Sequence, residues 1–117
     1  MNFEDYREYC LGKPFVSEGF PFDKSTLVFK VDGKMFALAD VDVFNSVNLK
    51  ATPESSIEMR ERYSAVQAGY HMNKKHWNTV IINADLPEDL FFKMIDDSYN
   101  LVFLSLSKKR RDELTLG

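Results

Sequence analysis

Residues 26–39 have the sequence TLVFKVDGKMFALA, and this stretch decides the fold. An Asp32-Gly33 pair separates two runs, 26–31 and 35–39, that are rich in β-branched and aromatic residues. Asp-Gly between such runs is the strongest short sequence signal of a two-residue hairpin turn, because both residues tolerate a positive φ. The stretch therefore predicts an antiparallel β-hairpin.

Helices and strands on both sides of the hairpin complete the predicted pattern. Apolar residues recur every three or four positions where we expect helices, and Asn2 and the Thr52-Pro53-Glu54 stretch are typical helix starts. We expect helices over residues 2–11, 52–63 and 86–106, and further strands over 46–50 and 78–83. Short strands around 15–16 and 65–66 remain open.

The predicted order is helix, three strands, helix, two strands, helix. Runs of strands joined by tight turns, with helices between the runs, indicate an α+β fold in which helices cover one face of a mainly antiparallel sheet. The regular alternation of a doubly wound nucleotide-binding fold is missing. We therefore predict a two-layer α-β(3)-α-β(2)-α domain.

The size and composition of the chain fit one globular domain. It has 117 residues, of which 44% are hydrophobic and 28% charged, so disorder and coiled coil are poor interpretations. We expect a single domain over 1–117, with a basic tail from about residue 107. The formal net charge of -3 disfavours DNA binding over the whole surface and limits any nucleic-acid site to a local basic patch.

The single cysteine and the first residues of the sequence indicate a reducing, intracellular setting. Cys10 is the only cysteine, so no disulfide can form within the chain. The start of the sequence lacks a secretory signal, and no apolar run approaches the ~20 residues of a membrane span. We expect a cytoplasmic protein without membrane association, and Cys10 as a small core residue.

The densest chemistry lies in residues 69–79, GYHMNKKHWNT. His71 and His76 raise metal binding and acid–base catalysis as hypotheses. Their five-residue spacing does not place both rings on one helical face, and the segment contains no Cys, Asp or Glu. A partner elsewhere in the chain stays open, but we predict no metal, no cofactor and no enzymatic activity.

A third hypothesis for this segment is contact with nucleic acid. Basic side chains suit phosphates, amides suit base edges, and aromatic rings offer faces for stacking. The basic side chains are Lys74 and Lys75, and the amides are Asn73 and Asn78. The aromatic rings are Tyr70 and Trp77. In the structural alternative, the aromatic side chains belong to the core and the lysines solvate a turn.

A second basic site is the run Lys108-Lys109-Arg110-Arg111, which follows the last predicted helix. Cations at that position either stabilise the carboxyl end of the helix or attract a polyanion. Asp112 and Glu113 follow at once and dilute the positive charge.

Several stretches resemble the MmcQ/YjbR family of small bacterial proteins. They are residues 26–38, Asn48-Leu49-Lys50, 69–80 and Asp97-Ser98-Tyr99, followed by the Lys-rich tail. The stretch 69–80, GYHMNKKHWNTV, is long and specific, and the resemblance covers nearly the whole chain. It implies an α-β(3)-α-β(2)-α fold, similar to secretion-chaperone-like and CyaY-type domains, and DNA binding through a double-wing motif.

The resemblance places a basic wing at residues 70–78, with Lys50 at the end of a neighbouring strand. We therefore predict a non-enzymatic DNA-binding protein. The candidate contacts are Lys50, Tyr70, His71, Asn73, Lys74, Lys75, His76, Trp77, Asn78, Lys108, Lys109, Arg110 and Arg111.

Two other functions stay open. One is a chaperone-like module that binds a protein partner, since phenylalanines such as Phe20, Phe22 and Phe36 belong either to the core or to a partner-facing surface. The other is a small-molecule-binding protein around His71, His76 and Trp77. We expect a monomer or a weak homodimer.

Overall fold

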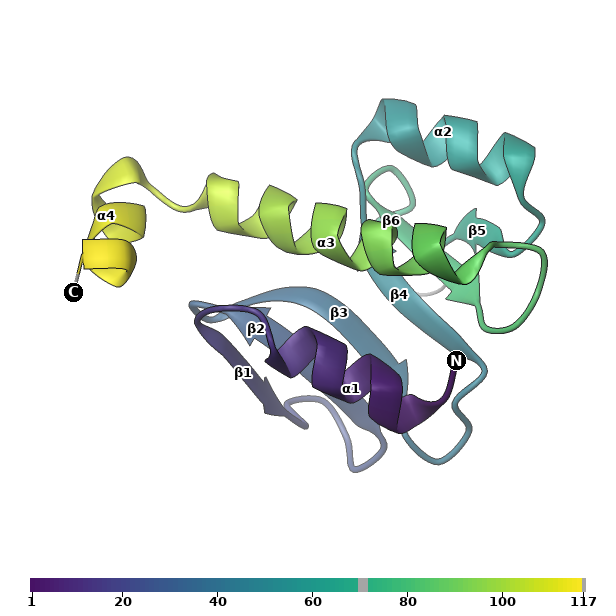
Figure 1. The fold of residues 1–117 in the computed structure, drawn as a ribbon, viewed down its shortest axis with the longest axis horizontal. Helices are drawn as coiled ribbons and strands as arrows, with labels where there is room; N and C mark the ends of the chain where they lie inside the picture. The colour runs from purple at the N-terminus through teal and green to yellow at the C-terminus, as the bar shows by residue number, and fades with distance from the viewer. Residues whose placement is uncertain (70–71, 117) are drawn as a thin grey trace.

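A computed structural model of the chain describes residues 1–69 and 72–116, and its elements form an α+β fold (Figure 1). The elements are α1 (Phe3–Leu11), β1 (Val16–Gly19), β2 (Thr26–Val31), β3 (Lys34–Asp40), β4 (Ser46–Lys50), α2 (Pro53–Arg62), β5 (Val66–Ala68), β6 (Trp77–Ile81), α3 (Glu88–Ser105) and α4 (Lys108–Leu116). The strands pair antiparallel in the order β1-β2-β3-β4-β6-β5. The predicted fold class is confirmed.

The predicted hairpin is confirmed as β2 and β3. Its turn residues Asp32 and Gly33 have φ values of 49° and 80°. Positive φ at both central residues is the conformation of a type I′ turn, which matches the twist of the two strands. Two short strands that the sequence left undecided are present in the structure. The one near residues 15–16 is β1, and the one near 65–66 is β5.

The stretch expected as a basic tail is instead the helix α4. Ser107 caps its start, because the Ser107 hydroxyl accepts a hydrogen bond from the Arg110 N–H at 3.1 Å. Ion pairs at helical spacing, Lys108–Asp112 and Arg110–Glu113, run along its surface. A further helix, α4, therefore follows α3.

The main core lies between the sheet and the helices. α1 contacts β1, and α3 contacts β2, β3 and β4. Tyr6 and Cys10 of α1 are fully buried, as is Phe36 of β3, and Phe91 and Ile95 of α3 are buried against the same cluster. The apolar stripe predicted for the longest helix is therefore the face that covers the sheet.

The sheet consists of two halves that separate at a fork between β3 and β4. These two strands pair only through Ala37–Leu49 and Leu38–Asn48, whereas β2–β3 and β4–β6 pair along most of their lengths. α1 lies over the β1–β3 half, α2 lies beside the β5–β6 half, and α3 runs across both (Figure 1).

Ser98 of α3 closes the fork from the helix side. Its hydroxyl accepts a hydrogen bond from the Lys50 N–H at 2.8 Å and donates one to the Phe36 carbonyl at 2.5 Å. Ser98 is fully buried, so its hydroxyl joins β3 and β4 from inside the core.

Trp77 of β6 closes the fork from the opposite face. Side chains alternate along a strand, and Val80 faces the helices, so Trp77 points away from them. Trp77 packs with Val28 of β2 and Leu38 of β3 in a small second cluster. Its side chain therefore joins the two halves of the sheet.

Candidate nucleic-acid interface

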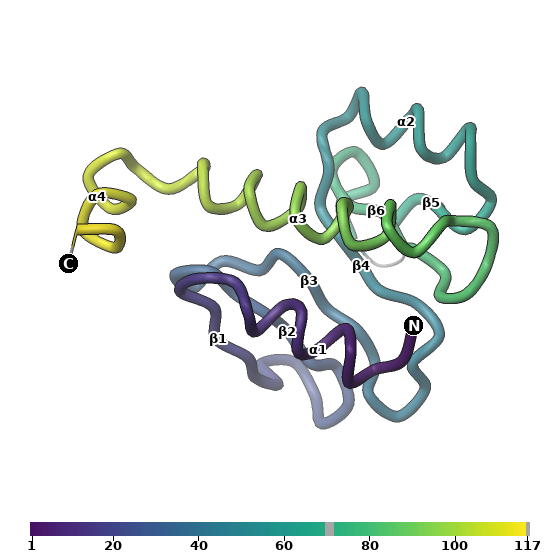
Figure 2. Tube along the Cα trace, in the orientation of Figure 1, coloured from purple at the N-terminus to yellow at the C-terminus, as the bar shows by residue number. Residues whose placement is uncertain are grey.

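The connections between elements alternate between the two ends of the sheet, because neighbouring strands run antiparallel (Figure 2). One end carries the β2–β3 turn, the β4–α2 junction, the β5–β6 connection and the α3–α4 junction. We name it the basic end, for the charges described next. The other carries the β1–β2, β3–β4 and β6–α3 loops and is named the acidic end.

Cationic side chains without a carboxylate partner gather at the basic end. Within residues 1–69 and 72–116, those at this end are Lys30 and Lys34 on the β2–β3 hairpin, Lys50 at the end of β4, Lys74 and Lys75 before β6, Arg60 of α2, whose guanidinium donates to the Lys74 carbonyl, and Lys109 and Arg111 on α4. Lys24, in the β1–β2 loop, is an unpaired lysine at the acidic end.

The remaining cations are locally compensated. Arg7, Lys13, Arg62, Lys93, Lys108 and Arg110 each pair with a carboxylate. Charges in such pairs contribute little to the field farther away, so the unpaired lysines of the basic end determine where an anion is attracted.

Carboxylates dominate the acidic end. They are Asp23, Asp40, Asp42, Asp85, Glu88 and Asp89. Some organise their loops: Asp85 accepts the backbone N–H groups of Ser64 and Ala65, and Asp23 accepts those of Ser25 and Thr26. These hydrogen bonds lower the pKa of both carboxyls, so both stay ionised at neutral pH. The net charge of -3 is therefore divided between two ends of opposite sign.

Residues 72–76, named the wing, lie in the β5–β6 connection, directly before β6. The wing is held by its backbone: Arg60 of α2 donates to the Lys74 carbonyl at 2.6 Å and to the Trp77 carbonyl at 3.1 Å. The Asn73 carboxamide oxygen accepts the Lys75 N–H at 2.9 Å. These contacts leave the side chains of Lys74 and Lys75 exposed.

The wing lies beside the end of β4. Lys50 is paired in register with Trp77, and Ala51 donates its N–H to the His76 carbonyl at 2.8 Å. The fold thus brings Lys50 next to the wing, as the sequence analysis expected. Tyr70 and His71, which belong to the predicted wing of residues 70–78, lie outside the described residues.

Asn78 is not a surface group. It is fully buried, and its carboxamide donates to the Ser56 hydroxyl at 3.1 Å and accepts from Arg60 at 2.7 Å. Asn78 therefore connects β6 to α2, and we remove it from the candidate contacts. Trp77 is 9% exposed and packed across the fork, so it offers no open face for base stacking.

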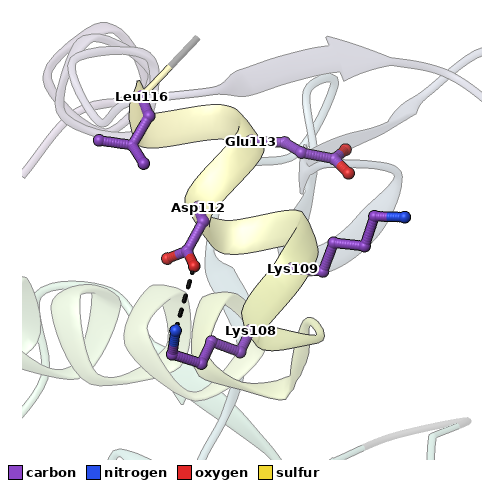
Figure 3. Close-up of a pocket in the computed structure, with 5 residues that line it drawn as sticks. All are labelled: Lys108, Lys109, Asp112, Glu113 and Leu116. Carbon is purple, nitrogen blue, oxygen red and sulfur yellow. Dashed lines mark hydrogen bonds and ion pairs between the residues drawn. The ribbon is translucent and has the colours of Figure 1, made fainter.

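Most basic side chains of α4 bind groups of the same chain. Arg110 donates two hydrogen bonds to the Asp32 carboxylate, at 2.9 and 2.7 Å, which lower the pKa of that carboxyl and attach α4 to the β2–β3 turn. Lys108 pairs with Asp112 at 3.3 Å (Figure 3). Arg111 donates to the Leu106 carbonyl at 3.2 Å. Lys109 is exposed and has no ion pair in the part of the chain described.

Lys30 and Lys34 are basic residues of this end that the sequence analysis missed. A signal was present for Lys30, because it stands between Phe29 and Val31, which are both fully buried on the helix side. Strand alternation then turns Lys30 to the open face. Lys34 directly follows the hairpin turn and is exposed.

Other kinds of site have little support among the described residues. They contain no group of three or more His, Cys, Asp and Glu side chains placed to hold a metal ion. Burial raises the pKa of the Cys10 thiol to about 12, so this cysteine is a core residue and not a nucleophile. A cavity of about 260 Å³ lies between α2 and α3, and neither His76 nor Trp77 lines it.

The family model described as YjbR matches residues 11–101. The chain belongs to the YjbR family. It is 36% identical over 115 residues to "Uncharacterized protein YbdF" of Escherichia coli O157:H7, covering 97% of this chain and 94% of the relative. It is 30% identical over 112 residues to "Uncharacterized protein YjbR" of Escherichia coli strain K12, covering 95% of each.

Solved structures support the same YjbR fold. The crystal structure of Deinococcus radiodurans protein DR2400 has a TM-score of 0.91 and 38% identity, covering 97% of this chain and 88% of that one. A Pseudomonas syringae protein has a TM-score of 0.73 and 27% identity, covering 87% and 99%. Among the described residues of this YjbR protein, no helix combines the length and apolar character needed to cross a membrane.

Proposed function

We propose that this YjbR-family protein binds duplex DNA through the phosphate backbone, using the basic end of its sheet, and that it acts by binding and not by catalysis. The proposed contacts are Lys50, Lys74 and Lys75, with Lys30 and Lys34 on the second hairpin and Lys109 on α4. In this proposal, the double-wing motif consists of the wing, residues 72–76, and the β2–β3 turn.

One observation carries the proposal: within residues 1–69 and 72–116, the cations that lack a carboxylate partner are concentrated at the basic end of an otherwise acidic chain. Phosphate contacts need exposed, unpaired cations, and each one made releases condensed counterions from the duplex. Asp23, Asp40, Asp42, Asp85, Glu88 and Asp89 lie at the far end of the sheet, so they orient the protein with its basic end toward a polyanion.

The proposed binding is not specific for sequence. Of the side chains expected to contact bases, Asn78 is buried in a hydrogen-bond network and Trp77 is packed across the fork. Lysine contacts to phosphates position a protein on DNA but carry no base information. We therefore expect similar affinities for unrelated duplexes of equal length.

The test is a salt titration of duplex binding for the parent protein and for Lys74→Gln/Lys75→Gln. Each phosphate contact contributes about -0.9 to the slope of log affinity against log salt concentration. We expect the double variant to flatten that slope by nearly two units and to bind all duplexes more weakly, with an unchanged free energy of unfolding because exposed charges contribute little to stability.

The matched control is Lys24→Gln/Arg62→Gln. It removes the same number of charges from exposed side chains, one in the β1–β2 loop and one at the end of α2, on the acidic side. We expect it to keep the parent slope. Failure of the parent to bind at low salt, or equal losses in both double variants, would contradict binding at the basic end.

A further inference from the structure

An exposed aromatic groove lies on the acidic side of the molecule, away from the proposed DNA contacts. It is a hollow of about 540 Å³ between α1 and the β1–β2 and β3–β4 loops, lined in part by Phe3, Phe20, Leu27 and Val41. Phe20 is 49% exposed. The neighbouring loops also expose Phe22 and Val43. Such a concentration of exposed apolar side chains marks an interaction surface.

The surroundings of this groove are acidic. Among the described residues, its one lining cation is Arg7, which is bound by the Glu18 carboxylate at 2.5 Å, and Glu4 and Glu8 of α1 act on the same guanidinium. The two loops beside the groove are tied together, since Val41 donates its N–H to the Ser25 carbonyl at 2.8 Å. They carry Asp23, Asp40 and Asp42. A partner for the groove therefore needs apolar side chains together with positive charge.

Helix α4 of the same chain has that chemistry. None of its residues is buried, and polar contacts attach it to its own chain: Arg110 to Asp32 and Arg111 to the Leu106 carbonyl. One open face of the helix carries Lys108, Lys109, Asp112, Glu113 and Leu116, of which Leu116 is 85% exposed (Figure 3). The two carboxylates of this face are paired, Asp112 with Lys108 and Glu113 with Arg110, which leaves the charge of Lys109 uncompensated among the described residues. A helix this short is marginal in water without packing, so a surface that buries this face would stabilise it.

We propose that the aromatic groove binds α4 of a second copy of this chain, in a head-to-tail contact. The contact joins the basic end of one molecule to the acidic side of the next, so unlike charges meet. A symmetric contact of groove to groove or of α4 to α4 brings like charges together, which is unfavourable. A head-to-tail interface does not close by itself on two molecules, so copies add to a chain or a ring.

The proposed contact shares Lys109 with the proposed DNA contacts but needs no DNA, so it is tested with the protein alone. The groove variant is Phe20→Asp, and the helix variant is Lys109→Glu/Leu116→Asp. All three positions are exposed, and Phe20 does not pack against either core cluster, so both variants are expected to unfold at the parent temperature. Ile57→Asp, on the exposed surface of α2, is the matched control.

Light scattering over rising concentration, into the millimolar range and at low salt, measures the mean mass. We expect the parent and the Ile57→Asp control to pass twice the monomer mass, and each interface variant alone to stay monomeric. The decisive sample is an equal mixture of the two interface variants. One partner keeps an intact α4 and the other an intact groove, so the mixture should form a one-to-one heterodimer.

Two results would overturn the proposal. In the first, the parent stays monomeric at all concentrations. In the second, the parent associates but the mixture of variants does not restore a heterodimer, which would indicate a symmetric contact or a different surface.

Discussion

Replacement of Trp77 with alanine is expected to lower the free energy of unfolding by about 3–5 kcal/mol, the usual cost of removing a large buried aromatic side chain. The indole is 9% exposed and packs on Val28 and Leu38, which belong to the other half of the sheet. Its removal leaves a cavity at the fork between β3 and β4, where few backbone pairs join the halves. Urea unfolding followed by circular dichroism measures the loss.

Ile57→Ala is the control for Trp77→Ala, because Ile57 is an apolar residue that is 58% exposed on α2. Its removal should change stability by no more than about 0.5 kcal/mol. If Trp77→Ala costs less than about 1 kcal/mol, the indole is not a packing element. Trp77 would then return to the set of side chains available for base stacking.

Replacement of Ser98 with alanine is expected to cost roughly 2–5 kcal/mol. The change removes both hydrogen bonds that bridge the fork, so the part-buried Lys50 N–H and the buried Phe36 carbonyl lose this partner. Each buried polar group that loses its partner costs about 1–3 kcal/mol. Because alanine favours a helix more than serine does, the loss cannot come from helix propensity.

Ser105→Ala tests the same substitution on the same helix. The Ser105 hydroxyl donates to the Val102 carbonyl at 2.6 Å, but Ser105 is exposed, so water can replace the bond. We expect Ser105→Ala to leave the unfolding midpoint close to that of the parent. Equal effects of the two substitutions would contradict the bridging role of Ser98.

Local chemistry explains what the sequence could predict. The Asp32-Gly33 turn was predictable because its conformation depends on those two residues and the strands beside them. The apolar stripe of α3 was predictable because its spacing directly reflects the buried face. Ser107 and the i, i+4 pair Lys108–Asp112 were local signals of α4, but a dense basic run also fits a solvated tail.

The candidate site was less predictable, because side-chain availability depends on residues distant in the sequence. Arg110 is bound by Asp32, which is 78 positions away. Asn78 is buried because Ser56 and Arg60 of α2 use its carboxamide. No local pattern shows which cations remain unpaired or that the loops at one end of the sheet collect the carboxylates.

The most direct test of the central claim is an NMR titration of the uniformly ¹⁵N-labelled protein with a short DNA duplex at low salt. The account predicts backbone amide shifts at Lys30–Lys34, Lys50 and the wing, none in the loops of Asp23, Asp40 and Asp85, and a return to the free positions as salt is raised, because counterion release drives phosphate binding. An unchanged spectrum at low salt, or shifts confined to the acidic end, would contradict DNA binding by the basic end.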